Sequence, residues 1–78
     1  MPEKADIYTP EVLALMARKE DMVPAAAIAP ILQMHPSVII KQAKEETWDR
    51  EHNGNFIRSG NRIKFYRIDF LRKGGWIP

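Results

Sequence analysis

The sequence predicts a small α+β fold, mostly helical, in which three helices precede a β-hairpin and a short closing helix. Two observations predict this order. Apolar residues recur at helical spacing as far as residue 48, whereas from residue 55 onwards they alternate with polar residues. Prolines and glycines separate these segments. With 78 residues, the chain has room for one domain.

The N-terminal region, residues 1–22, is predicted to contain a mobile lead followed by a helix over residues 9–20. Thr9 can cap this helix, and Pro10 suits its first position because the missing N–H group would have no partner there. Glu11 lies at the positive end of the helix dipole. These three residues together mark the start of the helix.

Two more helices are predicted next, one from Pro24 to about Gln33 and one from Pro36 to about Trp48. Pro30 falls inside the first of them, which predicts a helix that is short or kinked. Gln33 stands in the turn between them, where glycine is usual. Glutamine tolerates a positive φ less well than glycine, so this turn is a weaker signal.

The chain from residue 49 is predicted to form a polar loop and then a hairpin with strands at residues 55–58 and 63–66. Ser59-Gly60-Asn61 supplies the turn, since glycine and asparagine tolerate a positive φ. On the second strand, Ile63 and Phe65 should face one way and the intervening basic residues the other. A helical turn and a tail are expected to follow at residues 69–73 and 74–78.

The apolar residues of these segments are expected to form the core, with Trp48 covering its edge. The predicted core residues are Val12, Leu13, Leu15, Met16, Ile39, Ile40, Phe56, Ile57, Ile63 and Phe65. The composition restricts what else can stabilise the domain. The chain has no cysteine, so disulfides and thiolate metal sites are excluded, and two histidines are too few for a metal cage unless carboxylates complete it. We therefore predict no metal and no cofactor.

The order of the elements describes a winged helix-turn-helix domain over residues 23–73, with an extra N-terminal helix and a two-stranded basic wing. The charge distribution agrees with this interpretation. Residues 1–34 carry three basic and five acidic residues, a net charge of −2, whereas residues 55–73 carry six basic residues against one acidic, a net charge of +5. Such an asymmetry favours a nucleic acid as the partner.

The predicted DNA-binding residues belong to the third helix and to the wing. The helix can place compact and polar side chains against the major groove, and its amino end can attract a phosphate. The wing can follow the backbone or enter the minor groove. The helix residues are Pro36, Ser37, Lys41, Gln42 and Lys44, and the wing residues are Arg58, Asn61, Arg62 and Lys64.

The stretches AAAIAPILQMHPSVIIKQAKE and NGNFIRSGNRIKFYRIDFL resemble the excisionase and MerR-like winged helix-turn-helix family. Small excisionases of conjugative transposons and related phage proteins are the nearest parallels, and the resemblance covers about residues 23–73. It implies sequence-specific binding of double-stranded DNA, either as an architectural excision factor that works with an integrase or as a small transcriptional regulator. The implied setting is a bacterial cell or a phage-infected host.

A protein-interaction adaptor on the same fold, for example in an integrase or phage packaging complex, is the alternative. Three observations favour this alternative: the modest net charge, the extra helix, and the acidic residues near the presumed DNA face. These acids are Glu45, Glu46, Asp49 and Glu51. An enzyme is not predicted, because His35, Ser37 and Asp49 come without an oxyanion hole or a pocket.

The assembly state and the compartment are also predicted. MerR-like regulators dimerise through a long helix after the wing, and the predicted tail is too short for one. We therefore expect a monomer or weak self-association, with cooperative assembly on DNA as an option. No apolar run reaches membrane-spanning length, and the polar, acidic start differs from a secretion signal. A cytoplasmic location without a membrane partner is expected.

Overall fold

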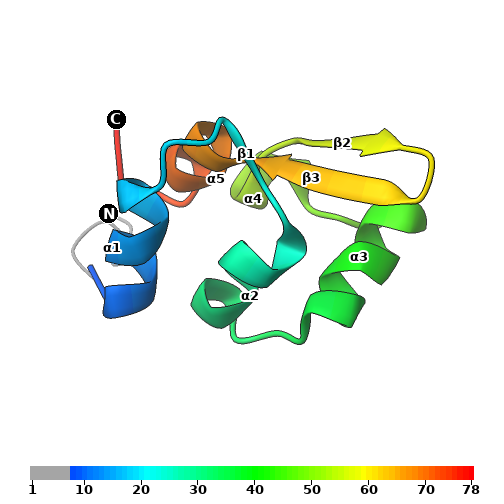
Figure 1. The fold of residues 1–78 in the computed structure, drawn as a ribbon, viewed down its shortest axis with the longest axis horizontal. Coiled ribbons are helices and arrows are strands. Elements are labelled where there is room, and N and C mark those ends of the chain that lie inside the picture. The colour runs from blue at the N-terminus through cyan, green and yellow to red at the C-terminus, as the bar shows by residue number, and fades with distance from the viewer. Residues whose placement is uncertain (1–7) are drawn as a thin grey trace.

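The computed structural model describes residues 8–78, so the lead predicted at the N-terminus lies, except for Tyr8, outside the described residues. About half of the described chain is helical, and the rest includes a three-stranded antiparallel sheet (Figure 1). The mixed α+β class is therefore confirmed. The helices are α1 (Pro10–Ala17), α2 (Ala25–Leu32), α3 (Pro36–Lys44), α4 (Arg50–Asn53) and α5 (Arg67–Lys73), and the strands are β1 (Met22–Val23), β2 (Phe56–Ser59) and β3 (Arg62–Tyr66).

The sheet has the order β1-β3-β2, with β3 paired on both sides. Phe65 of β3 lies opposite Phe56 in β2 and opposite Val23 in β1. Ile63 and Phe65 are buried while their neighbours on β3 are exposed, as the alternation predicted. The prediction of only two strands was wrong. The residues of β1 lie between two predicted helices and were assigned to neither, because a strand of two residues carries no periodic pattern.

The core lies between the inner face of the sheet and the helices. Phe65 is fully buried, with its ring centroid 4.9 Å from that of Trp48 and 5.7 Å from that of Phe56. The indole nitrogen of Trp48 donates a hydrogen bond to the carbonyl oxygen of Gly54 at 2.9 Å. Trp48 therefore covers the core as predicted, and its one polar group is satisfied.

Two of the predicted core residues are exposed instead. Leu13 keeps 51% of its surface accessible, because α1 turns Val12 and Leu15 inward and leaves Leu13 outside. Ile57 is 44% exposed, because it lies opposite Lys64 on the outer face of the sheet. In both cases the residue is apolar but its position in the element faces away from the core.

α1, α2 and α3 begin within one residue of their predicted starts, and α1 and α3 end earlier than predicted. The Thr9 hydroxyl accepts a hydrogen bond from the Val12 N–H at 3.3 Å, which caps α1. α1 then ends at Ala17 instead of residue 20, because Arg18 adopts an extended backbone. α2 continues through Pro30 as a short helix of eight residues, which was one of the two predicted outcomes.

α3 ends at Lys44 rather than near Trp48, because the chain reverses at Glu46, which has a φ of 60°. The polar segment that follows was predicted to be a loop, and it contains α4. Asp49 caps α4 by accepting a hydrogen bond from the His52 N–H at 3.1 Å. α4 buries no residue, so no apolar periodicity could predict it.

The C-terminal end packs on the molecule instead of trailing from it. α5 begins at Arg67, two residues before the predicted helical turn, and continues directly from β3. Trp76 was predicted to lie in a tail, but it is buried, with only 7% of its surface exposed. Its ring stacks on Phe70 with centroids 5.8 Å apart. The predicted tail thus contributes to the core.

Candidate nucleic-acid interface

Three residues, Gln33, Met34 and His35, connect α2 to α3. Gln33 has a φ of 57°, so it occupies the left-handed conformation in which glycine is usual. The N–H groups of Gln33 and Met34 both donate to the carbonyl oxygen of Ala29, which is small and buried. α2 and α3 are thus two short helices joined by a turn of three residues.

His35 caps the amino end of α3. Its Nδ1 accepts a hydrogen bond from the Ser37 N–H at 3.2 Å and lies 2.8 Å from the Ser37 Oγ. In this arrangement His35 and Ser37 complete a helix terminus. Pro36 occupies the first helical position, as predicted.

The outward face of α3 carries two basic side chains. Ile39 and Ala43 are fully buried, and Lys41 and Lys44 are exposed on the far side of the helix. Ser37 is also exposed, and the spacings of four and three residues place Ser37, Lys41 and Lys44 on one face.

Gln42 does not share this face. It follows Lys41 directly, so it is rotated by about 100° around the helix, and it is half-buried. Its backbone carbonyl oxygen accepts the N–H groups of Thr47 and Trp48 where the chain leaves α3. The sequence prediction put Gln42 with the lysines because it considered residue type before the direction of each position.

The hairpin divides its basic residues between two faces. The strand register places Lys64 opposite Ile57, and Arg62 opposite Ser59, on the outer face. Arg58 lies opposite Ile63 and therefore on the inner face, although it is exposed near the turn. The predicted cluster of four wing residues is thus split by the pleat.

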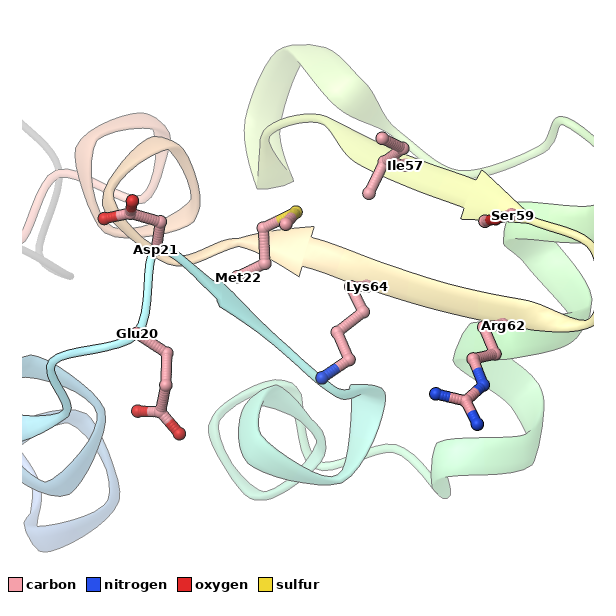
Figure 2. A pocket seen from close by; sticks show the side chains of 7 residues that line it. All are labelled: Glu20, Asp21, Met22, Ile57, Ser59, Arg62 and Lys64. Carbon is pink, nitrogen blue, oxygen red and sulfur yellow. The ribbon is translucent and has the colours of Figure 1, made fainter.

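The turn of the hairpin consists of Gly60 and Asn61. Of the two, only Gly60 adopts a positive φ, of 63°. Asn61 is exposed at the tip, and the Arg58 Nε donates to the Gly60 carbonyl oxygen at 3.2 Å. Figure 1 shows this turn end of the hairpin close to the carboxyl end of α3, and Figure 2 shows the same neighbourhood with Arg62 in front of it.

The cations of α3 and the hairpin differ from most others in their partners. Within residues 8–78, Lys41, Lys44, Arg62 and Lys64 make neither an ion pair nor a side-chain hydrogen bond, and Arg58 donates only to the Gly60 carbonyl oxygen in its own turn. Most remaining basic side chains of that range have a specific partner. Arg18, Arg50 and Lys73 pair with carboxylates, Arg67 and Arg72 donate to backbone carbonyl oxygens, and Lys19 is the exception. Uncommitted positive charge therefore gathers on the two predicted elements.

The acids beside the predicted DNA face are partly neutralised. Glu46 pairs with Arg50 at 3.3 Å, and Asp49 pairs with the His52 Nδ1 at 2.8 Å. The hydrogen bond from the His52 side chain, followed by that from its backbone N–H, lowers the pKa of Asp49. Glu45 and Glu51 are exposed.

The contribution of Asp49 to stability is expected to depend on pH. A carboxylate with a lowered folded-state pKa stabilises the protein above its unfolded-state pKa, near 3.9, and this contribution is lost as the pH falls through the folded-state value. An Asp49→Asn variant should therefore be less stable than the natural protein at about pH 6, and this difference should shrink towards about pH 2. Urea unfolding at both pH values measures it. A difference that stays constant would contradict this role.

A hollow of about 530 Å³ on the outer face of the sheet was not predicted. Figure 2 shows Glu20 and Asp21 at one end, Arg62 at the other, and Met22, Ile57 and Lys64 between them. No local sequence pattern predicts this hollow, because it depends on β1 lying beside β3. Among the described residues, no cluster of three or more histidine or acidic residues could hold a metal ion. No helix in that range is long and apolar enough to cross a membrane.

Comparisons with known proteins leave the family open. No protein-family model, no curated protein and no solved structure matches this chain significantly. The functional argument therefore rests on the residues and their arrangement.

Proposed function

We propose that the protein binds double-stranded DNA through α3 and the β2–β3 hairpin, in the manner of a winged helix-turn-helix domain. The observation that carries this proposal is the distribution of uncommitted cations. Four basic side chains on these two elements have no partner and Arg58 donates only to the Gly60 carbonyl oxygen, whereas elsewhere in residues 8–78 Lys19 is the one basic side chain without a partner. Phosphates are the natural counter-ions for such a surface, because Lys and Arg release condensed counterions when they neutralise them.

In this proposal α3 enters the major groove with its outward face. Lys41 and Lys44 contact phosphates or base edges, and Ser37 adds an exposed hydroxyl near the amino end of the helix. The backbone N–H groups of that end are bound by His35, so the phosphate site predicted there is left out of the proposal. Gln42 is left out of the contact set because it is half-buried and points to the flank of the helix. The DNA contact that the sequence predicted for Gln42 is therefore replaced by a structural role.

The hairpin acts as the wing in this proposal. Asn61 and Arg62 lie at the tip, where the groove or the backbone can be reached, and Arg58 and Lys64 extend the contact along the strands. The division of Arg58 and Arg62 between two faces suits a tip that is inserted between two phosphate backbones. A narrow minor groove with its strong negative potential would favour the arginines.

The resemblance to excisionase and MerR-like proteins suggests the biological role in which the protein would bind DNA. The protein would be an architectural excision factor or a small transcriptional regulator in a bacterial or phage-infected cell, with an integrase as partner in the first case. The angle by which the protein bends duplex DNA on binding separates the two roles, because excision requires bending and simple repression does not.

The proposal is tested by measuring affinity for a DNA duplex over a range of salt concentrations. We expect binding at low salt that weakens steeply as salt rises, with a log–log slope of about −0.9 for each phosphate contact. A Lys41→Ala, Lys44→Ala double variant should reduce the slope by about 2. Lys19→Ala, which removes an unpaired cation on another part of the surface, is the control and should leave the slope nearly unchanged. Absent binding at low salt, or binding indifferent to salt, would refute the proposal.

A further inference from the structure

The outer face of the sheet carries most of the exposed apolar side chains. Within residues 8–78, seven large apolar or aromatic side chains are exposed, and Met22, Ile57, Tyr66 and Ile68 lie on or beside this face. Met22 of β1 lies directly opposite Tyr66 of β3 in the strand register. A cluster of this kind on a small protein marks a site of contact with another macromolecule.

Two adjoining hollows cross this face and share Asp21. The first, of about 530 Å³, contains Met22 and Ile57 (Figure 2). The second, of about 350 Å³, lies over Tyr66 and Ile68. The apolar residues therefore occupy the middle of one continuous surface.

The charges are separated along this surface. Arg62 and then Lys64 lie on the part of β3 next to the hairpin turn, and Tyr66 follows two residues later. Asp21 lies beyond Met22 at the opposite end (Figure 2). Within residues 8–78 none of these three charged side chains makes an ion pair. Glu20 and Asp69 are also acidic at this end, but Arg18 binds Glu20 at 3.1 Å and Lys73 pairs with Asp69 at 3.7 Å. Arg72 lines the second hollow as well and donates to the Pro78 carbonyl oxygen, so Asp21 is the available acid.

We infer that this face binds a second copy of the same chain. The two-fold axis of this dimer lies in the plane of the face and passes near Met22 and Tyr66. It brings the Lys64 end of each copy over the Asp21 end of the other. The apolar centres then meet each other. A surface with a base at one end, an acid at the other and apolar residues between them is self-complementary in this arrangement. This dimer does not depend on the proposed DNA binding, and it would cover Arg62 and Lys64.

Self-association of the full chain without DNA tests the inference. The face is small, so the dimer is expected to be weak and to appear in sedimentation equilibrium between about 10 μM and 1 mM protein at low salt. Raising the salt should weaken it, since exposed charges are screened. Ile57→Glu should weaken it at least about tenfold. Leu13→Glu, an equally exposed apolar residue on α1, should leave it unchanged. A monomer at every concentration, or equal effects of the two variants, would overturn the inference.

A charge exchange makes the test specific to the two-fold arrangement. Asp21→Lys makes both ends of the face basic, and Lys64→Glu makes both ends acidic, so each variant alone should be monomeric. An equal mixture should form a heterodimer, because both contacts become attractive again. A mixture that stays monomeric would contradict this pairing. Since no DNA is present, failure here leaves the DNA proposal standing, and failure of DNA binding leaves the dimer standing.

Discussion

A Gly54→Ala variant is expected to lose roughly 3–5 kcal/mol of folding stability, which combines backbone strain with overpacking. Gly54 has a φ of 85° and a ψ of 179°, a conformation that is essentially reserved for glycine. A Cβ atom at this position would lie 2.9 Å from the Asp69 carbonyl carbon and 2.9 Å from the Phe70 nitrogen. Both are backbone atoms of α5, so the clash cannot be relieved by turning a side chain.

The loss matters because the domain is small. A chain of this size has a total stability of about 4–12 kcal/mol, so the variant should be largely unfolded or close to it. Displacement of residue 54 by the clash would also disturb the hydrogen bond from Trp48 to the Gly54 carbonyl oxygen. Urea or thermal unfolding followed by tryptophan fluorescence measures the effect.

Gly60→Ala is the matched control. Gly60 also has a positive φ, of 63°, but a Cβ there would meet no atom within 4 Å. Its cost should be limited to the left-handed backbone, about 1–2 kcal/mol. If the two variants lost equal stability, the close approach of α5 to Gly54 would not be the cause.

Replacing Arg58, Arg62 and Lys64 together with alanine is expected to reduce affinity for duplex DNA by about 100-fold or more at moderate salt. The log–log salt slope should fall by about 2–3, because each lost phosphate contact removes about 0.9. The three side chains are exposed and make no ion pair within residues 8–78, so the fold should survive. Fluorescence anisotropy with a labelled duplex measures the affinity, and circular dichroism checks the fold.

A second triple variant separates contact from net charge. Alanine at Lys19, Arg72 and Lys73 removes the same amount of charge from other parts of the surface. It should lower affinity only slightly, through the weaker overall field. If both triple variants lost affinity equally, the hairpin would hold no specific place in the interface, and the protein-interaction adaptor would become the better interpretation.

The sequence predicted those parts of the fold that have a local signal. Thr9 and Pro10 marked the start of α1, and the alternation of Ile63 and Phe65 gave the inner face of β3. It failed where the structure depends on distant partners. β1 exists because Met22 and Val23 pair with Tyr66 and Phe65, far along the chain, and no local pattern reports such a contact.

The candidate site was predictable in composition and less so in geometry. The basic residue types of α3 and the hairpin were evident, since charge is read directly from the sequence. The directions in which Gln42 and Arg58 point could not be predicted from the sequence, because they depend on where α3 lies against the core and on the register of β2 with β3. The outer-face hollow was missed for the same reason as β1.

The double pairing of β3 also has a consequence for how the chain folds. Joining β2 to β3 closes only a two-residue turn, whereas joining β1 to β3 closes a loop that contains α2, α3, α4 and β2. Loop closure over such a distance is entropically costly and slows folding. The hairpin can therefore form early by itself, and the arrival of β1 ties the N-terminal helix to the rest, which makes the folding of both ends a single cooperative event.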